Sequence, residues 1–98
     1  MIGRVATFQV QPGKLDEVVG LAKKALAVME EQKVKGYKGY LALVDRQANK
    51  YVGLQLWETE ADATAFATGS LNKELMAPLV GLIAGPPTSE VYEVAIQV

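Results

Sequence analysis

Residues 37–58, YKGYLALVDRQANKYVGLQLWE, decide the fold of this 98-residue chain. The segments 37–45 and 50–58 are rich in aromatic, β-branched and aliphatic residues, a composition that favours β-strands. The four residues RQAN separate the two segments. The stretch therefore predicts an antiparallel β-hairpin.

The segment before the hairpin predicts a strand followed by a helix. Ile2 to Val10 mixes β-branched, aromatic and small residues and ends at Gln11-Pro12-Gly13, where proline and glycine break the strand. From Lys14 onward an apolar stripe with helical spacing indicates an amphipathic helix, which Gly36 stops. The stripe consists of Leu15, Val18, Val19, Ala22, Ala25, Leu26 and Met29. Burying each large aliphatic side chain contributes roughly 1.5 to 3 kcal/mol, so packing on a sheet decides the stability of this helix.

The segment after the hairpin predicts more helix and a last strand. The Thr59 hydroxyl is suited to cap a helix, and Glu60 and Asp62 complement the positive charge at its N-terminal end. The segments expected to follow are a break over 69–72, a helical piece over 73–83 disturbed by Pro78, the helix-breaking Gly85-Pro86-Pro87 and a final strand over 88–98.

The resulting order of elements, βαββαβ, predicts an α+β fold of the ferredoxin-like split βαβ type. We expect a four-stranded antiparallel sheet with the helices on one face. No repeat, linker or low-complexity tract interrupts the sequence. One domain over residues 1–98 is therefore expected.

The composition of the second face of this sheet indicates whether the chain has a partner, because two helices cover only one side of a four-stranded sheet. Side chains alternate between the faces along each strand, and both sets contain large apolar residues. We expect the uncovered side to carry Tyr40, Val44, Val91 and Trp57. Such a patch is larger than a monomer usually exposes, which predicts a homodimer formed through the sheet faces.

Composition excludes several classes of function. The 10 basic and 11 acidic residues form no blocks of charge, so no nucleic-acid or membrane partner is expected. The absence of cysteine and histidine excludes disulfides, thiolate catalysis, a Ser-His-Asp triad and the usual zinc sites. No metal site is expected. The chain begins without a signal-length apolar run, and its longest apolar stretch, 77–84, is too short to span a bilayer. We expect a soluble cytoplasmic protein.

Several short motifs around the hairpin resemble a known family. They are Gly36-Tyr37-Lys38-Gly39-Tyr40, Leu41-Ala42-Leu43-Val44-Asp45 and VGLQLWETE at 52–60, accompanied by Pro12-Gly13-Lys14-Leu15 and Val91-Tyr92-Glu93-Val94. In these motifs the chain is similar to the antibiotic biosynthesis monooxygenase-like family of dimeric α+β barrels. The motifs mostly encode strand-turn-helix geometry, so they identify fold and dimer more directly than chemistry.

The resemblance implies a cofactor-independent oxygenase that acts on an electron-rich aromatic substrate, or, in a sister branch, a haem-degrading enzyme. The family's third-strand tryptophan matches Trp57. Members active as oxygenases tend to carry an asparagine near the first or third strand, and haem-degrading members carry a histidine on the second helix. Here the third strand offers Gln55 instead, and the chain has no histidine, which disfavours haem degradation. An oxygenation without cofactor needs a pocket that holds the substrate, promotes its deprotonation and excludes water.

The candidates for binding a substrate in such a pocket are Trp57, Gln55, Arg4, Thr7 and Tyr40, and no catalytic residue is assigned. Each candidate has a structural alternative. Trp57 forms a pocket wall or packs in the core or at a dimer edge. Gln55 orients a substrate oxygen or pairs across an interface, and Arg4 steers an anionic or phenolate group or is a surface charge. Tyr40, like the other three tyrosines, exchanges a proton with a substrate hydroxyl or simply packs on its strand.

Two functions are compatible with these features. The first is a monooxygenase that oxidises a small aromatic or quinol-type metabolite without a cofactor. The second is a non-catalytic homodimer that binds a small hydrophobic molecule or serves as an interaction module. A cavity of roughly 300 Å³ or more that contains Trp57 and a polar group would favour the enzyme, and a filled interior would favour the second function.

Overall fold

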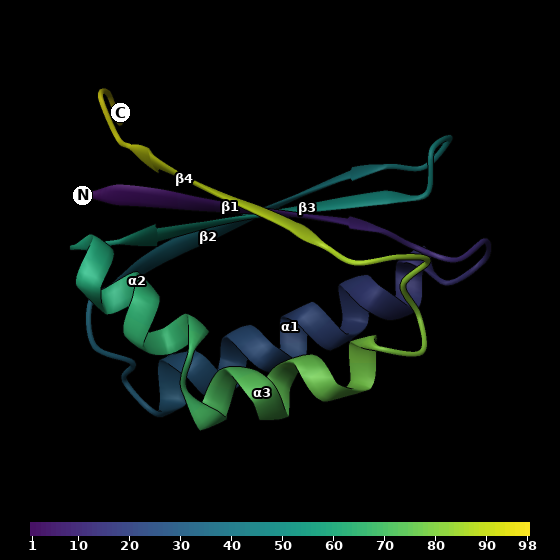
Figure 1. Ribbon diagram of the computed structural model, residues 1–98, viewed down its shortest axis with the longest axis horizontal. Helices are drawn as coiled ribbons and strands as arrows, with labels where there is room; N and C mark the ends of the chain where they lie inside the picture. The colour runs from purple at the N-terminus through teal and green to yellow at the C-terminus, as the bar shows by residue number, and fades with distance from the viewer.

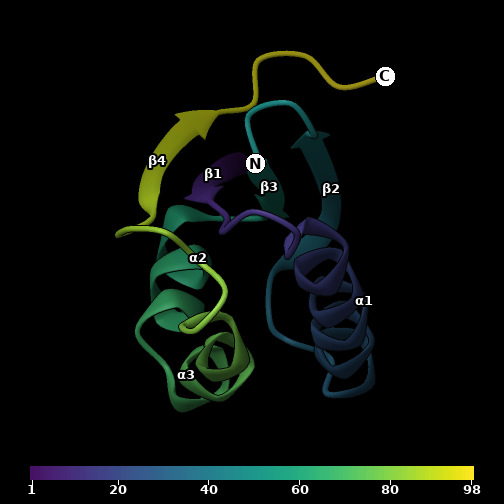
Figure 2. The ribbon, with the colours of Figure 1, turned by 90° about the vertical axis from the view of Figure 1, so that its right-hand side faces the viewer.

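The hairpin and the two ends of the chain form one sheet. The computed structural model describes residues 1–98. Neighbouring strands pair antiparallel in the order β2-β3-β1-β4, and the helices cover one face (Figure 1, Figure 2). The elements are β1 (Ile2–Gln9), α1 (Leu15–Glu31), β2 (Tyr37–Asp45), β3 (Lys50–Trp57), α2 (Glu60–Ala67), α3 (Ser70–Met76), the 3-10 turn η1 (Ala77–Leu79) and β4 (Thr88–Glu93). This arrangement confirms the predicted ferredoxin-like α+β fold. None of the helices is long and apolar enough to cross a membrane.

The turn between β2 and β3 is held by the last side chain of β2. The Asp45 carboxylate accepts hydrogen bonds from the backbone N–H groups of Gln47 and Ala48, both at 3.1 Å. Asn49 then takes a positive φ of 52°, a conformation that asparagine adopts more readily than most residues. The polar turn therefore sets the hairpin register that places Tyr40 opposite Gln55.

The start of α2 follows the capping pattern expected from the sequence. The Thr59 hydroxyl accepts a hydrogen bond from the Asp62 N–H at 3.1 Å. The break after α2 is shorter than expected, because Gly69 alone takes an extended conformation and Ser70 already begins α3. The helix α3 then passes into η1, where Pro78 lacks the N–H that would continue the α-helical ladder.

The last strand is shorter than the sequence pattern predicts. β4 ends at Glu93, which lies opposite Ile2 at the start of β1. The Val94 N–H still donates a hydrogen bond to the Met1 carbonyl at 3.1 Å, which is the last contact of this segment with β1. Residues 95–98 therefore run outside the sheet, on the side away from the helices (Figure 2).

The grouping of side chains by face was predicted correctly, but the two faces were exchanged. Tyr40, Val44, Val91 and Trp57 share the face that the helices cover, so the prediction that they form the uncovered side was wrong. The Trp57 indole is fully buried against α2, with its ring centroid 5.3 Å from that of Phe66. Alternation determines which residues share a face, whereas packing against the helices determines which face is buried.

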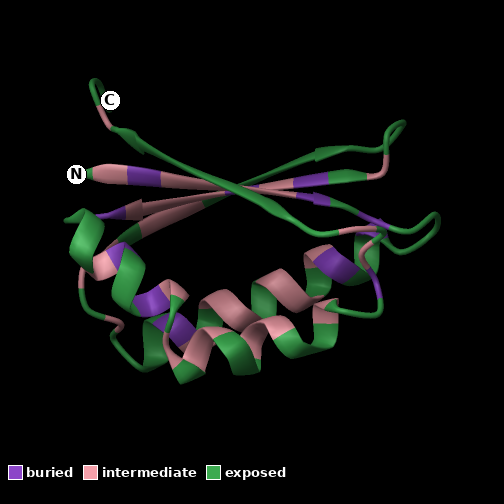
Figure 3. Cartoon of the chain, viewed as in Figure 1, coloured by how far each residue is buried: buried purple, intermediate pink, exposed green.

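The uncovered face is also apolar. Leu41, Leu43 and Tyr92 are 54%, 52% and 53% exposed on it, and Figure 3 shows both edge strands as largely exposed. The other apolar members of this face are Val5, Val52, Leu54 and Leu56. The accessible surface of the chain is 6313 Å², whereas a folded monomer of 10.5 kDa is expected to expose about 5,400 Å². The chain therefore exposes more surface than a self-sufficient monomer of its size.

Two glycines differ in what a methyl group would meet. Gly36 has a φ of +80°, and a Cβ there would collide with the Asp62 side chain, whereas Gly20 lies on the exposed side of α1 with nothing within 4 Å. We expect Gly36→Ala to lower the free energy of unfolding by about 1 to 3 kcal/mol. Gly20→Ala is expected to raise it by about 0.4 to 1 kcal/mol, because alanine favours a helix. Urea denaturation measures both effects, and equal effects of the two substitutions would contradict this account.

Candidate functional site

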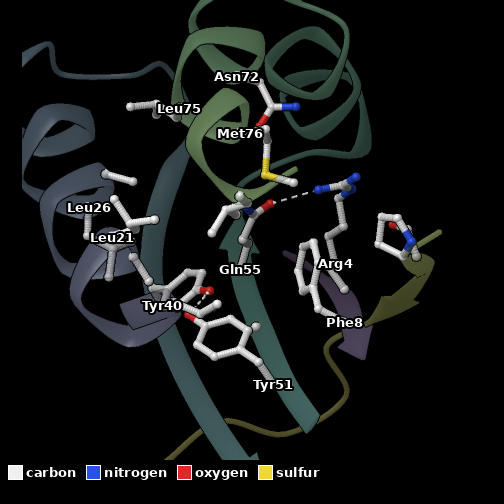
Figure 4. Close-up of a pocket in the computed structure, with 18 of the residues that line it drawn as sticks. Arg4, Phe8, Leu21, Leu26, Tyr40, Tyr51, Gln55, Asn72, Leu75 and Met76 are labelled. Atoms are coloured by element: carbon white, nitrogen blue, oxygen red, sulfur yellow. Dashed lines mark hydrogen bonds between the residues drawn. The ribbon is translucent and has the colours of Figure 1, made fainter. Parts of the chain in front are cut away.

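A cavity of about 140 Å³ lies between the covered face of the sheet and the helices α1 and α3 (Figure 4). Fourteen of the 21 residues that line it are hydrophobic. A cavity of roughly 150 Å³ is large enough to hold a benzene ring. The interior therefore contains a cavity, but the volume of this cavity is smaller than the roughly 300 Å³ of a typical ligand pocket.

The cavity exists because small residues face one another across it. Ala6 and Gly53 are register partners on the central strands, so neither brings a large side chain of its own to the middle of the sheet. Ala22 and Ala25 of α1 line the opposite wall. Since α1 packs on the sheet through larger residues at its two ends, Leu15 and Met29, the space between these small residues stays open.

Arg4 brings a positive charge to this apolar space. The side chain is half-buried, and its Nη1 donates a hydrogen bond to the Gln55 Oε1 at 3.4 Å. The two salt bridges of the chain join other residues, so no carboxylate pairs with Arg4. Burial lowers the pKa of the Arg4 guanidinium from its ordinary value, but a guanidinium remains protonated at neutral pH. The cavity therefore carries one positive charge without a counter-ion from the protein.

Gln55 holds this arrangement together from the centre of the sheet. Its Oε1 accepts hydrogen bonds from Arg4 and also from the Trp57 Nε1 at 3.1 Å. Trp57 does not line the cavity, so of the two roles considered for its indole the structure favours packing in the core. The buried indole instead fixes the orientation of the Gln55 amide, which in turn positions the Arg4 guanidinium.

Two tyrosines bring hydroxyl groups to the cavity, whose lining also includes Thr88 and Ser89. The hydroxyls of Tyr40 and Tyr51 are 2.7 Å apart and share a hydrogen bond. Burial raises the pKa of both phenols, and their mutual hydrogen bond raises the pKa of Tyr40 further. Both side chains are therefore uncharged at neutral pH, so they are hydrogen-bonding groups and weak general bases.

The structure gathers three of the five sequence-predicted residues at one site. Arg4, Gln55 and Tyr40 line the cavity together. Thr7 does not, because it lies opposite Val52 on the uncovered face, one step out of phase with Arg4 along β1.

Asn72 is a lining residue that the sequence analysis missed. Its Nδ2 donates a hydrogen bond to the Ala67 carbonyl at 3.1 Å, which leaves the side-chain oxygen free to accept a hydrogen bond (Figure 4). We had expected residues 69–72 to be a break between helices, whereas α3 begins at Ser70. The sequence did contain a signal for this helical face. Four residues at helical spacing line the cavity: Asn72, Leu75, Met76 and Leu79.

No group of carboxylates is placed to hold a metal ion.

Residues 1–76 match the family model for antibiotic biosynthesis monooxygenases. The chain belongs to this family. Its fold is similar to that of SnoaB, a cofactor-independent oxygenase from Streptomyces nogalater, with a TM-score of 0.80 and 15% identity over 99% of this chain and 95% of that chain. No curated protein matches the sequence.

Two further proteins of similar fold are named without an activity. A protein of unknown function from Nitrosomonas europaea is similar with a TM-score of 0.81 and 20% identity, covering 99% of this chain and 91% of that chain. A conserved protein from Methanosarcina mazei has a TM-score of 0.77 and 23% identity, covering 93% of this chain and 89% of that chain. At such identities the similarity establishes the fold, and the chemistry has to be argued from the site.

The buried tyrosines are expected to make the stability of this family member sensitive to alkaline pH. The folded pKa values of Tyr40 and Tyr51 lie above the unfolded value of about 10, so the native state retains its protons to a higher pH. The free energy of unfolding should therefore decline as the pH rises above about 10. In urea denaturation at pH 8 and pH 11, we expect a smaller decline for the double variant Tyr40→Phe/Tyr51→Phe. Tyr92→Phe is the comparison, because the pKa of this exposed tyrosine is raised mainly by its hydrogen bond to Glu90 rather than by burial, and we expect it to change the decline less than the double variant does. An equally steep decline in the double variant would contradict the prediction.

Proposed function

We propose that this protein is a cofactor-independent monooxygenase that oxidises a small aromatic substrate of the phenol or quinol type. The observation that carries the proposal is the unpaired Arg4 guanidinium at an apolar cavity with room for one ring. Membership of the antibiotic biosynthesis monooxygenase family and the fold shared with a cofactor-independent oxygenase support it.

The chemistry requires an ionised substrate, because a phenolate gives electrons to oxygen more readily than a phenol. The Arg4 charge favours the ionised form of a substrate hydroxyl, and the released proton passes to solvent. For a simple quinol, one oxygen atom of O₂ replaces a ring hydrogen and the other leaves as water. The ring supplies the four electrons and becomes a hydroxyquinone. The apolar walls exclude further water from the reacting ring.

A second candidate function is binding of the same kind of ligand without turnover. The small cavity volume favours it, as does the position of Trp57 behind the cavity rather than in it. The neutral tyrosine pair is also a weak base for a substrate proton. Oxygen consumption separates the two functions.

We also propose that the protein acts as a homodimer in which the uncovered sheet faces pack together. The exposed side chains of Leu41, Leu43 and Tyr92 and the excess of accessible surface support this arrangement. A large contiguous apolar patch on a small protein is usually covered by a partner. A two-fold axis through the face would bury the same residues of both copies.

The Arg4 charge is expected to control the reaction. With hydroquinone as substrate, we expect Arg4→Met to lower kcat/KM about 100-fold, in the range found when one oxyanion donor is removed. The pH at which the rate reaches half its maximum should also rise, since the substrate then ionises without assistance. An oxygen electrode measures both quantities, and Lys24→Met, which removes an exposed positive charge on α1, is the matched control. No oxygen uptake by the folded wild type with any quinol would refute the monooxygenase and favour the binding protein.

Substitutions that introduce charged side chains on the uncovered face test the proposed dimer. Sedimentation of the wild type should give twice the chain mass of 10.5 kDa at micromolar concentration. Leu41→Glu/Leu43→Glu should give the mass of one chain, because it buries two charges in the proposed interface. Val80→Glu is the matched control, since Val80 is 72% exposed but lies outside the sheet. Circular dichroism checks that each variant is folded. A monomeric wild type, or a dimer unaffected by the double substitution, would exclude this interface.

A further inference from the structure

The start of β2 contains a β-bulge to which the proposed function gives no role. Between Tyr37 and Gly39 the pairing with β3 shifts by one residue, which leaves Lys38 as an extra residue in β2. In a regular strand, residues three positions apart face opposite sides of the sheet. Because of the bulge, Tyr37 and Tyr40 instead both face the helices.

The rings of these two tyrosines diverge along the sheet. The Tyr37 ring packs against Trp57, with the ring centroids 5.7 Å apart. The Tyr40 hydroxyl lies over Gly53, farther along β3, and shares a hydrogen bond of 2.7 Å with Tyr51. Between the C-terminal half of α1 and the start of β2, an open groove of about 470 Å³ is lined by both tyrosines. The bulge therefore produces a surface groove beside the inner cavity.

Two side chains separate this groove from the cavity. Leu26 of α1 and Tyr40 of β2 line both spaces, and no other residue does. Both are half-buried, and Figure 4 shows them at the border of the cavity that adjoins α1. The wall between the groove and the cavity therefore consists of these two side chains, and a movement of Tyr40 would join the two spaces.

The hydrogen bond to Tyr51 holds Tyr40 in the position that closes this wall. A Cβ at residue 53 would collide with the Tyr40 hydroxyl, so only glycine lets the phenol lie close enough to β3 to reach Tyr51. Rotation of Tyr40 to another side-chain rotamer would move its ring away from β3 and break this hydrogen bond. The net free energy of one hydrogen bond is small, so the closed position is stable but can open.

The border of the cavity near β4 is less suited to the passage of an apolar ring. The polar lining residues on this side are Arg4, Asn72, Thr88 and Ser89. A ring that passes the guanidinium has to displace water from a charged group, which costs free energy. Leu26 and Tyr40 present an aliphatic side chain and an aromatic ring, which carry no charge. An apolar ligand therefore meets the smaller barrier at the wall beside the groove.

We propose that the groove is the entrance to the cavity and that Tyr40 is its gate, held closed by Tyr51. The ligand first contacts the groove, Tyr40 rotates away from β3, and the ligand passes between Tyr40 and Leu26. The entrance serves a ligand that is oxidised and one that is only bound, so this inference does not depend on the monooxygenase activity. The gate controls the rates of entry and exit, and not the affinity of an apolar ligand.

The probe is fluorobenzene, a single ring without a hydroxyl group, since an apolar cavity of roughly 150 Å³ holds benzene. Exchange between the free and the bound probe, followed by fluorine NMR, gives the association and dissociation rates. Tyr40→Phe should raise both rates about 2- to 10-fold, the effect of one lost hydrogen bond, and leave the affinity unchanged. Tyr51→Phe breaks the same hydrogen bond and should do the same. Tyr37→Phe is the matched control, because Tyr37 lines the groove but not the wall, and it should change neither rate.

A large ring placed at either border of the cavity tests where the entrance lies. Lys38→Trp narrows the groove and should lower the association and dissociation rates of fluorobenzene. Ser89→Trp, at the border near β4, should leave the association rate unchanged. Both residues are exposed on strands, where tryptophan is well accommodated. Circular dichroism checks that each variant is folded.

The outcomes are distinct from those that test the proposed function. The inference would be overturned by absence of fluorobenzene binding, by rates that do not respond to Tyr40→Phe and Tyr51→Phe, or by a changed affinity without an equal change in both rates. Slower association in Ser89→Trp but not in Lys38→Trp would place the entrance near β4 and overturn it as well. Quinol oxidation combined with any of these results would leave the monooxygenase intact. Gated binding without oxygen uptake would support the inference and refute the monooxygenase.

Discussion

The alternation of side chains along β3 is the constraint on which the rest of the structure depends. Four successive residues on one side of this strand build the covered face. Tyr51 supplies a cavity hydroxyl, Gly53 leaves room for the Tyr40 hydroxyl, Gln55 supplies the amide that accepts from Arg4 and Trp57, and Trp57 is the largest core residue. The residues between them, Val52, Leu54 and Leu56, form the centre of the uncovered face. A register slip of one residue would exchange the two sets and remove the core and the site together. The Asp45 turn, which sets this register, therefore acts on function as well as on folding.

Features with a local physical cause could be predicted from the sequence. The hairpin, the amphipathic α1 and the Thr59 cap each depend on residues within a few positions of one another. The choice of covered face could not be predicted in the same way, because both faces of β3 are apolar and alternation is symmetric between them. The packing of Trp57 with Met29 of α1 and Phe66 of α2 breaks this symmetry. The sequence also did not show which side chains of β1 face the helices. Thr7 was therefore predicted to be a site residue, although it lies on the other side of β1 from Arg4.

The sequence predicted only part of the site, because some of its residues depend on long-range packing and element boundaries. Residues with distinctive chemistry on strands, such as Arg4 and Gln55, stand out among apolar neighbours once the strands are assigned. Asn72 does not, because its importance depends on where α3 begins, and helix boundaries near glycine are set by a single residue. The cavity is harder still to foresee. It results from the coincidence of small residues on three elements, and each alanine or glycine alone is unremarkable in its own segment.

The hollow interior and the apolar outer face are physically linked. A pocket of about 140 Å³ takes the place of packed side chains in a chain that buries only 12 residues, so the core has fewer contacts to stabilise it. A monomer of this size has little other core with which to offset that loss. Burial of a second apolar face against another copy would offset it, at a place that does not fill the cavity. In the proposed dimer, the surface that stabilises the protein would be separate from the space proposed to receive a ligand. Small residues such as Ala6 and Gly53 at the centre of so small a domain would then be compatible with a stable protein, because the partner would supply burial that the pocket does not.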